Sequence, residues 1–229
     1  PNGDKFSGEW DNDNWQGQGK FYYKNGDFYK GFIENKKKIG EGVFNYLNGD
    51  VYKGNFKNDK RDGLGTMNYN NGDTYVGHWK DGLKSGIGKL TYKNGARYDG
   101  EFLNNKQTGT GTYIYGDNEK YEGTWKDGYF EGLGTYYYIN GSRYFGNWLG
   151  GLRHGHGSIT YYSNGSKYDG EWKNDFKNGK GTFIYVNGDM YEGGWKNDKM
   201  NGDGVFSYKN GNKYIGNYKD GKRSGKGTF

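Results

Sequence analysis

The chain has 229 residues, with 46 Gly, 25 Tyr, 13 Phe, 7 Trp, one Pro and no Cys. The lack of Cys excludes disulfides and thiolate zinc or redox sites. No apolar run of 18 residues exists, so the sequence predicts no membrane-spanning helix. The 33 basic and 27 acidic residues leave a formal charge of +6, a mixed surface without the dense basic stripe of a nucleic-acid-binding protein.

An aromatic-x-Gly unit opens each of ten repeats in chain order. Two residues after the glycine stands a second large apolar residue, which is aromatic in every repeat except the second, where Ile33 takes its place beside Phe32. We expect residues 1–229 to form one continuous array, cut from a longer one, because the chain opens on Asn2-Gly3, the turn of a preceding repeat. The repeats begin near Phe6, Tyr29, Tyr52, Tyr75, Tyr98, Tyr121, Tyr144, Tyr168, Tyr191 and Tyr214.

The second half of each repeat has a polar loop, a Gly-x-Gly and two alternating apolar residues, followed in most repeats by Asn-Gly. One copy runs through Gly63-Leu64-Gly65, Met67, Tyr69 and Asn71-Gly72. Alternation predicts two strands per repeat with one aromatic and one polar face. Asn-Gly predicts a primed hairpin turn, and the strand glycines are expected to leave room for rings of the next repeat.

One hairpin cannot bury this aromatic surface alone, whereas stacked hairpins can. We therefore predict an all-β fold, an elongated single-layer twisted antiparallel sheet of about 20 strands built from stacked β-hairpin repeats. Single-layer packing would leave part of the aromatic face uncovered, and exposed aromatic patches usually mark interfaces. That face is the predicted protein-binding surface.

The whole pattern resembles the MORN (membrane occupation and recognition nexus) repeat, for which Tyr121-Glu122-Gly123-Thr124-Trp125 is a typical opening. An array of little else resembles the cytoskeletal MORN scaffold proteins of protozoan parasites. The resemblance implies a non-catalytic scaffold without cofactors, in the cytoplasm at the cytoskeleton and peripheral to membranes. Such a scaffold self-associates and recruits cytoskeletal or membrane-associated proteins, including in cell division. The alternative is a module that binds phosphoinositides or other anionic phospholipids.

The resemblance also implies a homodimer formed through the C-terminal repeats. A twofold contact is self-complementary and closes without making fibres. The aromatic residues expected near this contact are Trp195, Phe206, Tyr208, Tyr214, Tyr218 and Phe229.

Basic residues recur in the predicted loops and would line up along one edge of a stacked array. They could contact anionic lipid headgroups, but we favour solubility and edge protection as their role, because acidic residues are interspersed among them. The lipid-contact candidates are Lys36, Lys37, Lys38, Lys60, Arg61, Lys222 and Arg223, and the same positions in other repeats hold Lys84, Lys106, Arg153, Lys177 and Lys199.

No catalytic constellation emerges from the remaining residues. The Gly-x-Gly units are not followed by the helix that a phosphate-binding loop needs. Carboxylates such as Asp99, Glu101 and Glu122 recur on the polar face, where a single-layer sheet offers no pocket to desolvate them. His154 and His156 are expected on one face and are weak candidates for Zn²⁺, which would need further ligands.

Overall fold

The computed structural model describes residues 3–229, so Asn2 of the predicted Asn2-Gly3 turn lies outside the described residues. The contacts divide the chain into two compact units, Pro1–Gly116 and Asp117–Phe229. Residues 3–229 form twenty strands, and no helix that could cross a membrane is found among them.

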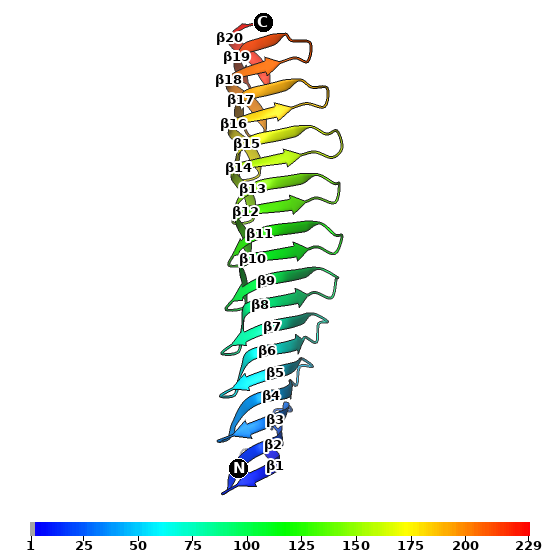
Figure 1. Cartoon of the computed structure of the whole chain (residues 1–229), viewed down its shortest axis with the longest axis vertical. Helices are drawn as coiled ribbons and strands as arrows, with labels where there is room; N and C mark the ends of the chain where they lie inside the picture. The colour runs from blue at the N-terminus through cyan, green and yellow to red at the C-terminus, as the bar shows by residue number, and fades with distance from the viewer. Residues whose placement is uncertain (1–2) are drawn as a thin grey trace. The chain divides into compact units, whose positions relative to one another are not determined.

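Ten strands make up the first unit, and each is antiparallel to its neighbour in sequence (Figure 1). They join into a single layer without crossovers. They are β1 (Lys5–Asp11), β2 (Asn14–Tyr22), β3 (Phe28–Glu34), β4 (Lys37–Asn45), β5 (Val51–Lys57), β6 (Lys60–Asn68), β7 (Thr74–Lys80), β8 (Leu83–Thr91), β9 (Arg97–Leu103) and β10 (Lys106–Ile114).

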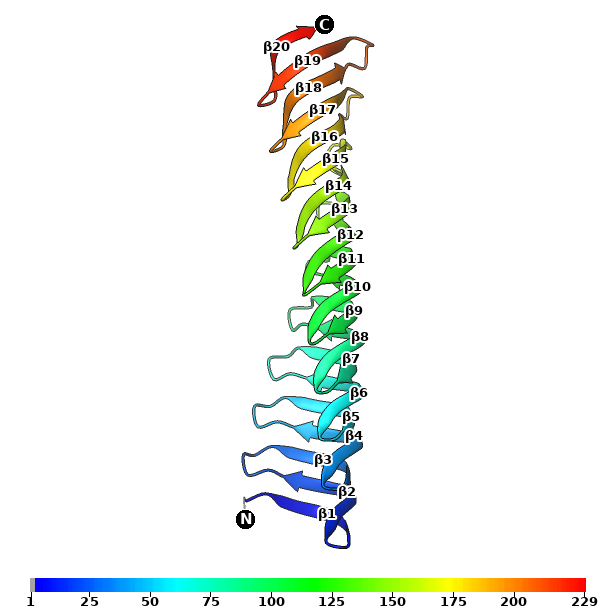
Figure 2. The same ribbon diagram turned by 90° about the vertical axis from the view of Figure 1, so that its left-hand side faces the viewer.

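The second unit repeats this meander with ten more antiparallel strands. Within each unit successive hairpins are rotated relative to one another (Figure 2), the usual twist of a β-sheet. The strands are β11 (Lys120–Lys126), β12 (Tyr129–Tyr137), β13 (Arg143–Leu149), β14 (Leu152–Thr160), β15 (Lys167–Lys173), β16 (Phe176–Ile184), β17 (Met190–Lys196), β18 (Lys199–Ser207), β19 (Lys213–Lys219) and β20 (Lys222–Thr228). The prediction of an all-β single-layer antiparallel hairpin array is confirmed.

The first tyrosine of eight hairpins, from β3–β4 to β17–β18, lies at the centre of the core, and we call these residues the inner tyrosine row. Each ring is fully buried, and each hydroxyl donates a hydrogen bond to the backbone carbonyl three residues later, as Tyr75 does to His78 at 2.9 Å. The row defines the aromatic face of the sheet and consists of Tyr29, Tyr52, Tyr75, Tyr98, Tyr121, Tyr144, Tyr168 and Tyr191.

Each inner tyrosine lies over two glycines that face each other across the hairpin. For Tyr75 these are the paired Gly77 and Gly88, and a Cβ added to Gly88 would lie 2.3 Å from the tyrosine hydroxyl. The expectation that these glycines make room for rings of the next repeat is therefore wrong. A Tyr-x-Gly spacing lets a ring fold back over its own hairpin, and the next repeat contributes edge-on contacts instead, such as Phe102 against Tyr75 at 5.1 Å.

The first glycine of each Gly-x-Gly has a different role. Gly86 has φ +71°, and the register of the β7–β8 hairpin shifts between Gly77 and Trp79. This β-bulge needs a left-handed residue, which glycine supplies without steric cost. The first glycine of the pair therefore allows the left-handed backbone of the bulge, and the second leaves space for the tyrosine ring above it.

The connections correct the turn prediction. The polar pair within a repeat forms the primed two-residue turn, since both Asp81 (φ 47°) and Gly82 (φ 87°) are left-handed. The Asn-Gly pair joins successive repeats in a longer turn, where Gly95 alone is left-handed and its N–H donates to the Tyr92 carbonyl at 3.0 Å. Asn94 stays right-handed because its side chain accepts the Ala96 N–H at 3.0 Å, an Asx-type bond.

Neighbouring turns are also tied together by carboxylates. Asp73 accepts the backbone N–H of Lys93, one repeat later, at 2.9 Å, and Asp50 accepts that of Asn70 at 2.8 Å. These bonds satisfy amides that a turn leaves unpaired. These bonds were not predicted, although an aspartate directly after Asn-Gly recurs at Asp27, Asp50, Asp73 and Asp189 and could have been a signal.

Candidate functional site

A second row of tyrosines runs along the aromatic face, and we call it the outer tyrosine row. Each member stands six or seven residues before the first tyrosine of the next repeat, at the entry to the turn between repeats. All nine are half-buried, and rings such as Phe44 and Tyr46 meet at 4.5 Å. The row consists of Tyr23, Tyr46, Tyr69, Tyr92 and Tyr115 in the first unit and Tyr138, Tyr161, Tyr185 and Tyr208 in the second.

Basic side chains lie over the rings of this face. Arg61 places its guanidinium carbon 4.2 Å from the Trp79 ring centroid, and Lys84 Nζ lies 5.3 Å from that of Tyr75. Both distances are within the range of cation–π attraction. The same arrangement recurs with Lys38 in the first unit and with Arg153, Lys177 and Arg223 in the second.

The structure thus divides the predicted basic ladder into two sets. The cations over the rings come from the second residue of a strand. This residue pairs with the large apolar residue of the same hairpin, as Lys84 does with Trp79 and Lys38 with Ile33. The other set lies at turns and strand starts with exposed side chains, and comprises Lys36, Lys37, Lys60, Lys106, Lys199 and Lys222. Only the exposed set matches the expected edge location.

Some cations on the rings have a carboxylate partner and others do not. Asp59 lies 3.2 Å from Lys38 Nζ, and Asp175 lies 3.0 Å from Arg153 Nε. Both acids occupy the second position of the next primed turn. For Arg61 and Lys84 that position holds Gly82 and Asn105, and neither cation has an ion pair within residues 3–229.

Burial acts directly on Lys84. Desolvation lowers the pKa of its ammonium, and the positive charge of Arg61 lowers it further, while Asp73 opposes the change. Desolvation also lowers the pKa of Lys177, with Asp198 acting in the opposite direction. The ammonium groups of Lys84 and Lys177 therefore lie over aromatic rings, where they are only partly hydrated and only partly neutralised by nearby carboxylates.

A cavity of about 300 Å³ opens on the aromatic face around Arg61 and Lys84. Its one acid, Asp50, has its two oxygens engaged by the Asn70 backbone N–H at 2.8 Å and the Asn48 side-chain amide at 3.0 Å. The other lining residues are Tyr46, Met67, Tyr69, Trp79 and Asn105. The cavity therefore combines aromatic walls with two cations.

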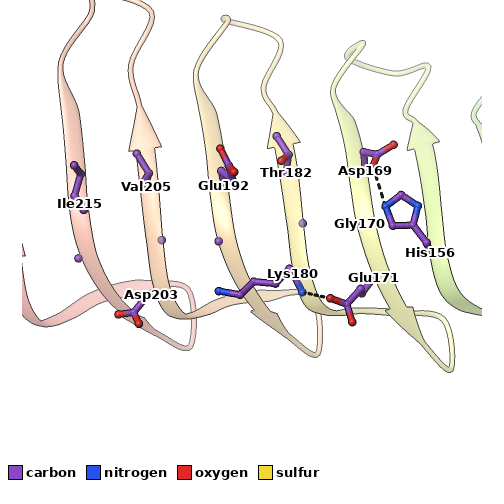
Figure 3. Close-up of a pocket in the computed structure, with 14 residues that line it drawn as sticks. His156, Asp169, Gly170, Glu171, Lys180, Thr182, Glu192, Asp203, Val205 and Ile215 are labelled. Atoms are coloured by element: carbon purple, nitrogen blue, oxygen red, sulfur yellow. Dashed lines mark hydrogen bonds and ion pairs between the residues drawn. The ribbon is translucent and has the colours of Figure 1, made fainter.

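The polar face carries an open groove over β14–β19 (Figure 3). His156 Nε2 lies 3.2 Å from Asp169, but both side chains are mostly exposed. Glu171 accepts the Lys180 backbone N–H at 2.8 Å and so braces the bulge of its own hairpin. This groove holds no desolvated acid–base pair.

Three of the predicted acidic and histidine candidates, Glu101, Glu122 and His156, have structural partners. Glu101 accepts the Thr110 N–H at 2.8 Å, which lowers its pKa, and Glu122 pairs with Lys120 at 2.7 Å. His156 faces Asp169, and within residues 3–229 no group of three or more metal-binding side chains includes it or His154. The zinc hypothesis gains no further ligand from the described residues.

The six rings predicted near a dimer contact occupy different environments. Trp195 is buried and its indole N–H donates to the Gly181 carbonyl at 3.0 Å, while Tyr214 and Tyr218 are also buried. Phe206 and Tyr208 are half-buried, and Phe229 is exposed. Only the last three offer substantial ring surface to a partner.

Comparison with protein families identifies the repeat. The family model does not match residues 29–51. The β3–β4 hairpin in this range nevertheless buries Tyr29 and places Ile33 where the other repeats have an aromatic residue. The family model described as MORN repeat matches residues 6–28, 52–74, 75–97, 98–120, 121–143, 144–166, 168–190, 191–213 and 214–229.

No curated protein matches the chain, whereas several solved structures do. The TCP10 domain of Danio rerio CPAP, in complex with a STIL peptide, is 14% identical with a TM-score of 0.47, covering 86% of this chain and 92% of that one. The CPAP G-box domain is 12% identical with a TM-score of 0.46, covering 89% and 100%. The Drosophila melanogaster Sas-4 TCP10c domain is 19% identical with a TM-score of 0.38, covering 70% and 96%. Such low similarity carries no inference about partners.

Proposed function

The chain belongs to the MORN-repeat family, and on that premise we propose that it is a non-catalytic scaffold that binds proteins along its aromatic face. The observation that carries the proposal is the half-buried outer tyrosine row with cations beside it. Tyrosine, tryptophan and arginine are the residues that contribute most to protein–protein binding energy. A repeating row of them suits a long partner segment that contacts several repeats.

Capture from native cells tests this proposal. The full chain is compared with the double variant Tyr46→Ala/Tyr69→Ala, whose changes lie in the half-buried row. The control is Tyr162→Ala, an exposed tyrosine outside both rows. We expect the double variant to lose proteins that the wild type and the control retain. Identical capture by all three would contradict the assignment of the aromatic face.

We further propose that the scaffold self-associates through its C-terminal repeats and works at a membrane-associated cytoskeletal structure, including in cell division. Support comes from the family resemblance and from the ring surface of Phe206, Tyr208 and Phe229. Light scattering should give a dimer mass for the full chain at tens of micromolar and a monomer mass after deletion of residues 191–229. Deletion of residues 1–28 is the control and should leave the dimer. A monomeric full chain would remove the proposal.

The second candidate is a module that binds anionic phospholipid. The observation that favours it is the set of turn lysines whose side chains are exposed. Each basic residue near an anionic surface contributes about 1 kcal/mol. Salt-sensitive sedimentation of the chain with phosphoinositide vesicles would favour this candidate, and no sedimentation at physiological salt would exclude it.

A further inference from the structure

We propose that the aromatic face around Arg61 and Lys84 binds an acidic, proline-rich segment of a partner protein, held as a polyproline II helix. The inference rests on the proposed protein-binding function and gives it a place and a partner chemistry. The two cations lie on neighbouring hairpins of the first unit, β5–β6 and β7–β8.

In the described part of the chain, the two cations of this site have no ion-pair partner. Arg61 and Lys84 occupy equivalent positions one repeat apart, and no carboxylate within residues 3–229 forms an ion pair with either. The Arg61 guanidinium donates to the Gly82 carbonyl at 2.6 Å, and this neutral oxygen does not replace an ion-pair partner. A half-buried cation without a counter-ion is a costly arrangement. An acidic side chain arriving from outside would relieve it with charge-assisted hydrogen bonds.

Two equivalent sites in other repeats hold a carboxylate where this site has none. Lys38 is paired with Asp59 and Arg153 with Asp175, each acid lying in the second turn position with φ near 70°. Asn105 has the same backbone conformation, with φ 71°, and its Oδ1 accepts the Lys84 backbone N–H at 2.9 Å. Asn105 thus copies the backbone role of these acids without their charge. The site is open because of two residues, Gly82 and Asn105.

Aromatic rings form the walls of the site. Tyr46, Tyr69 and Trp79 line the same cavity as the two cations, and both tyrosines are half-buried. Proline rings pack well on aromatic side chains, and proline-rich segments characteristically bind in aromatic grooves. A segment in this conformation is already extended before binding, so it loses less entropy than a flexible one.

The distance between adjacent repeats matches the repeat of a polyproline II helix. Equivalent residues in adjacent repeats are two strand widths apart, about 9.6 Å. A polyproline II helix returns to the same face every three residues, about 9.3 Å along its axis. An extended strand repeats its face at about 6.6 Å and an α-helix at about 5.4 Å. A polyproline II segment with an acid at every third residue therefore matches Arg61 and Lys84, with prolines against Tyr46 and Tyr69.

The test uses the full chain and a labelled peptide of four Glu-Pro-Pro triplets, with binding followed by fluorescence anisotropy. Two control peptides replace Glu by Lys, or the prolines by Gly and Ser. We expect the acidic proline-rich peptide to bind about tenfold more tightly than either control, because charge and conformation both contribute. Equal binding of the Gly/Ser control would overturn the conformational inference, and equal binding of the Lys control would overturn the charge inference.

Protein variants then locate the site. Asn105→Asp places beside Lys84 the acid that Asp59 presents to Lys38, and should weaken binding about fivefold or more by internal competition. Lys84→Gln should weaken it similarly, whereas Arg153→Gln, which alters a cation already paired, should leave it unchanged. Unaltered binding by both Asn105→Asp and Lys84→Gln would overturn the assigned site. Melting curves should show that all three variants remain folded.

The outcomes separate this inference from the broader proposal. Failure of every peptide, with cellular partners still lost in the Tyr46→Ala/Tyr69→Ala variant, would overturn the partner chemistry and leave the scaffold function standing. Loss of vesicle binding on Asn105→Asp, with no peptide binding, would overturn the inference in favour of a lipid headgroup.

Discussion

The inner and outer tyrosine rows share one face and one residue type but differ in their surroundings. Tyr75 has no exposed surface, lies over Gly77 and Gly88, and donates its hydroxyl to the His78 carbonyl. Tyr69, six residues earlier, is half-buried beside Lys84 at the entry to a turn. The absence of side chains on two glycines is what lets the inner ring sink into the sheet.

This contrast teaches that the inner row maintains the fold while the outer row remains available for binding. Aromatic content alone would assign both rows to the core. The local partner decides the role, because a ring above a glycine pair is enclosed whereas a ring above a turn keeps an open edge. Variants at matched positions in the two rows can break or sharpen this comparison.

The largest effect is expected from truncating the two rings in parallel. Tyr75→Ala removes a fully buried ring and should lower the free energy of unfolding by about 3–5 kcal/mol. Tyr69→Ala should cost less than half as much, because its ring is already partly solvated. Urea denaturation of both variants measures the difference. Equal losses would end the distinction between the rows.

Filling the space beneath an inner ring should come next. A Cβ on Gly123 would lie 2.5 Å from Gly134 Cα and 2.7 Å from the Leu133 carbonyl oxygen, which are backbone atoms that cannot move aside. We expect Gly123→Val to lower the free energy of unfolding by about 3 kcal/mol through overpacking.

The matched control for this variant is Thr124→Val, one residue along and on the opposite face. Thr124 donates its hydroxyl to the Glu131 carbonyl, so the change should cost about 1 kcal/mol. Equal melting temperatures of the two variants would refute the placement of Gly123 beneath the Tyr121 ring.

Alkaline pH should destabilise the fold through the inner row. Burial raises the pKa of Tyr52 and Tyr191 to about 12, because desolvation disfavours tyrosinate. The stability that these protonated rings contribute is complete below the unfolded pKa near 10, and it is lost as pH rises through about 12. Denaturation midpoints should be flat to about pH 10 and then fall. Titration of every tyrosine in the folded chain with a midpoint near the ordinary pKa of about 10 would contradict this.

The smallest expected effect comes from removing single hydroxyls. Tyr75→Phe removes the hydrogen bond to the His78 carbonyl, so it should cost about 1 kcal/mol. The Tyr69 hydroxyl forms no hydrogen bond within residues 3–229, and Tyr69→Phe should be close to neutral. Thermal melts resolve a difference of this size. A larger loss for Tyr69→Phe would reverse the assignment of the rows.

Much of the fold could be predicted because the repeat is strict. The Tyr-x-Gly and Gly-x-Gly spacings indicated two strands per repeat and an aromatic face. The turns were assigned to the wrong connections, because Asn-Gly is a strong hairpin signal when taken alone. The pairs that actually form primed turns, such as Asn58-Asp59 and Asp81-Gly82, are varied in sequence and read as generic polar loops.

The candidate site could be predicted only in outline. Sequence analysis identified the basic residues, but it placed Arg61 and Lys84 with the turn lysines along an edge. A β-bulge after each Tyr-x-Gly changes which residues face the rings, and its presence depends on the left-handed Gly86 and its equivalents. Bulges cannot be located from alternation alone, since they are departures from it.

The repeat, the strand pattern and the family could be recognised in the amino-acid sequence, because the side-chain period is a local property. Only the tertiary structure decided which ring covers which glycine, which cation stands over which ring, and which cations have a carboxylate partner. These are contacts within a hairpin or between neighbouring repeats, and they depend on register, bulges and turn geometry together. The open site at Arg61 and Lys84 belongs to this second class, since neither Gly82 nor Asn105 signals it without the turn that brings them there.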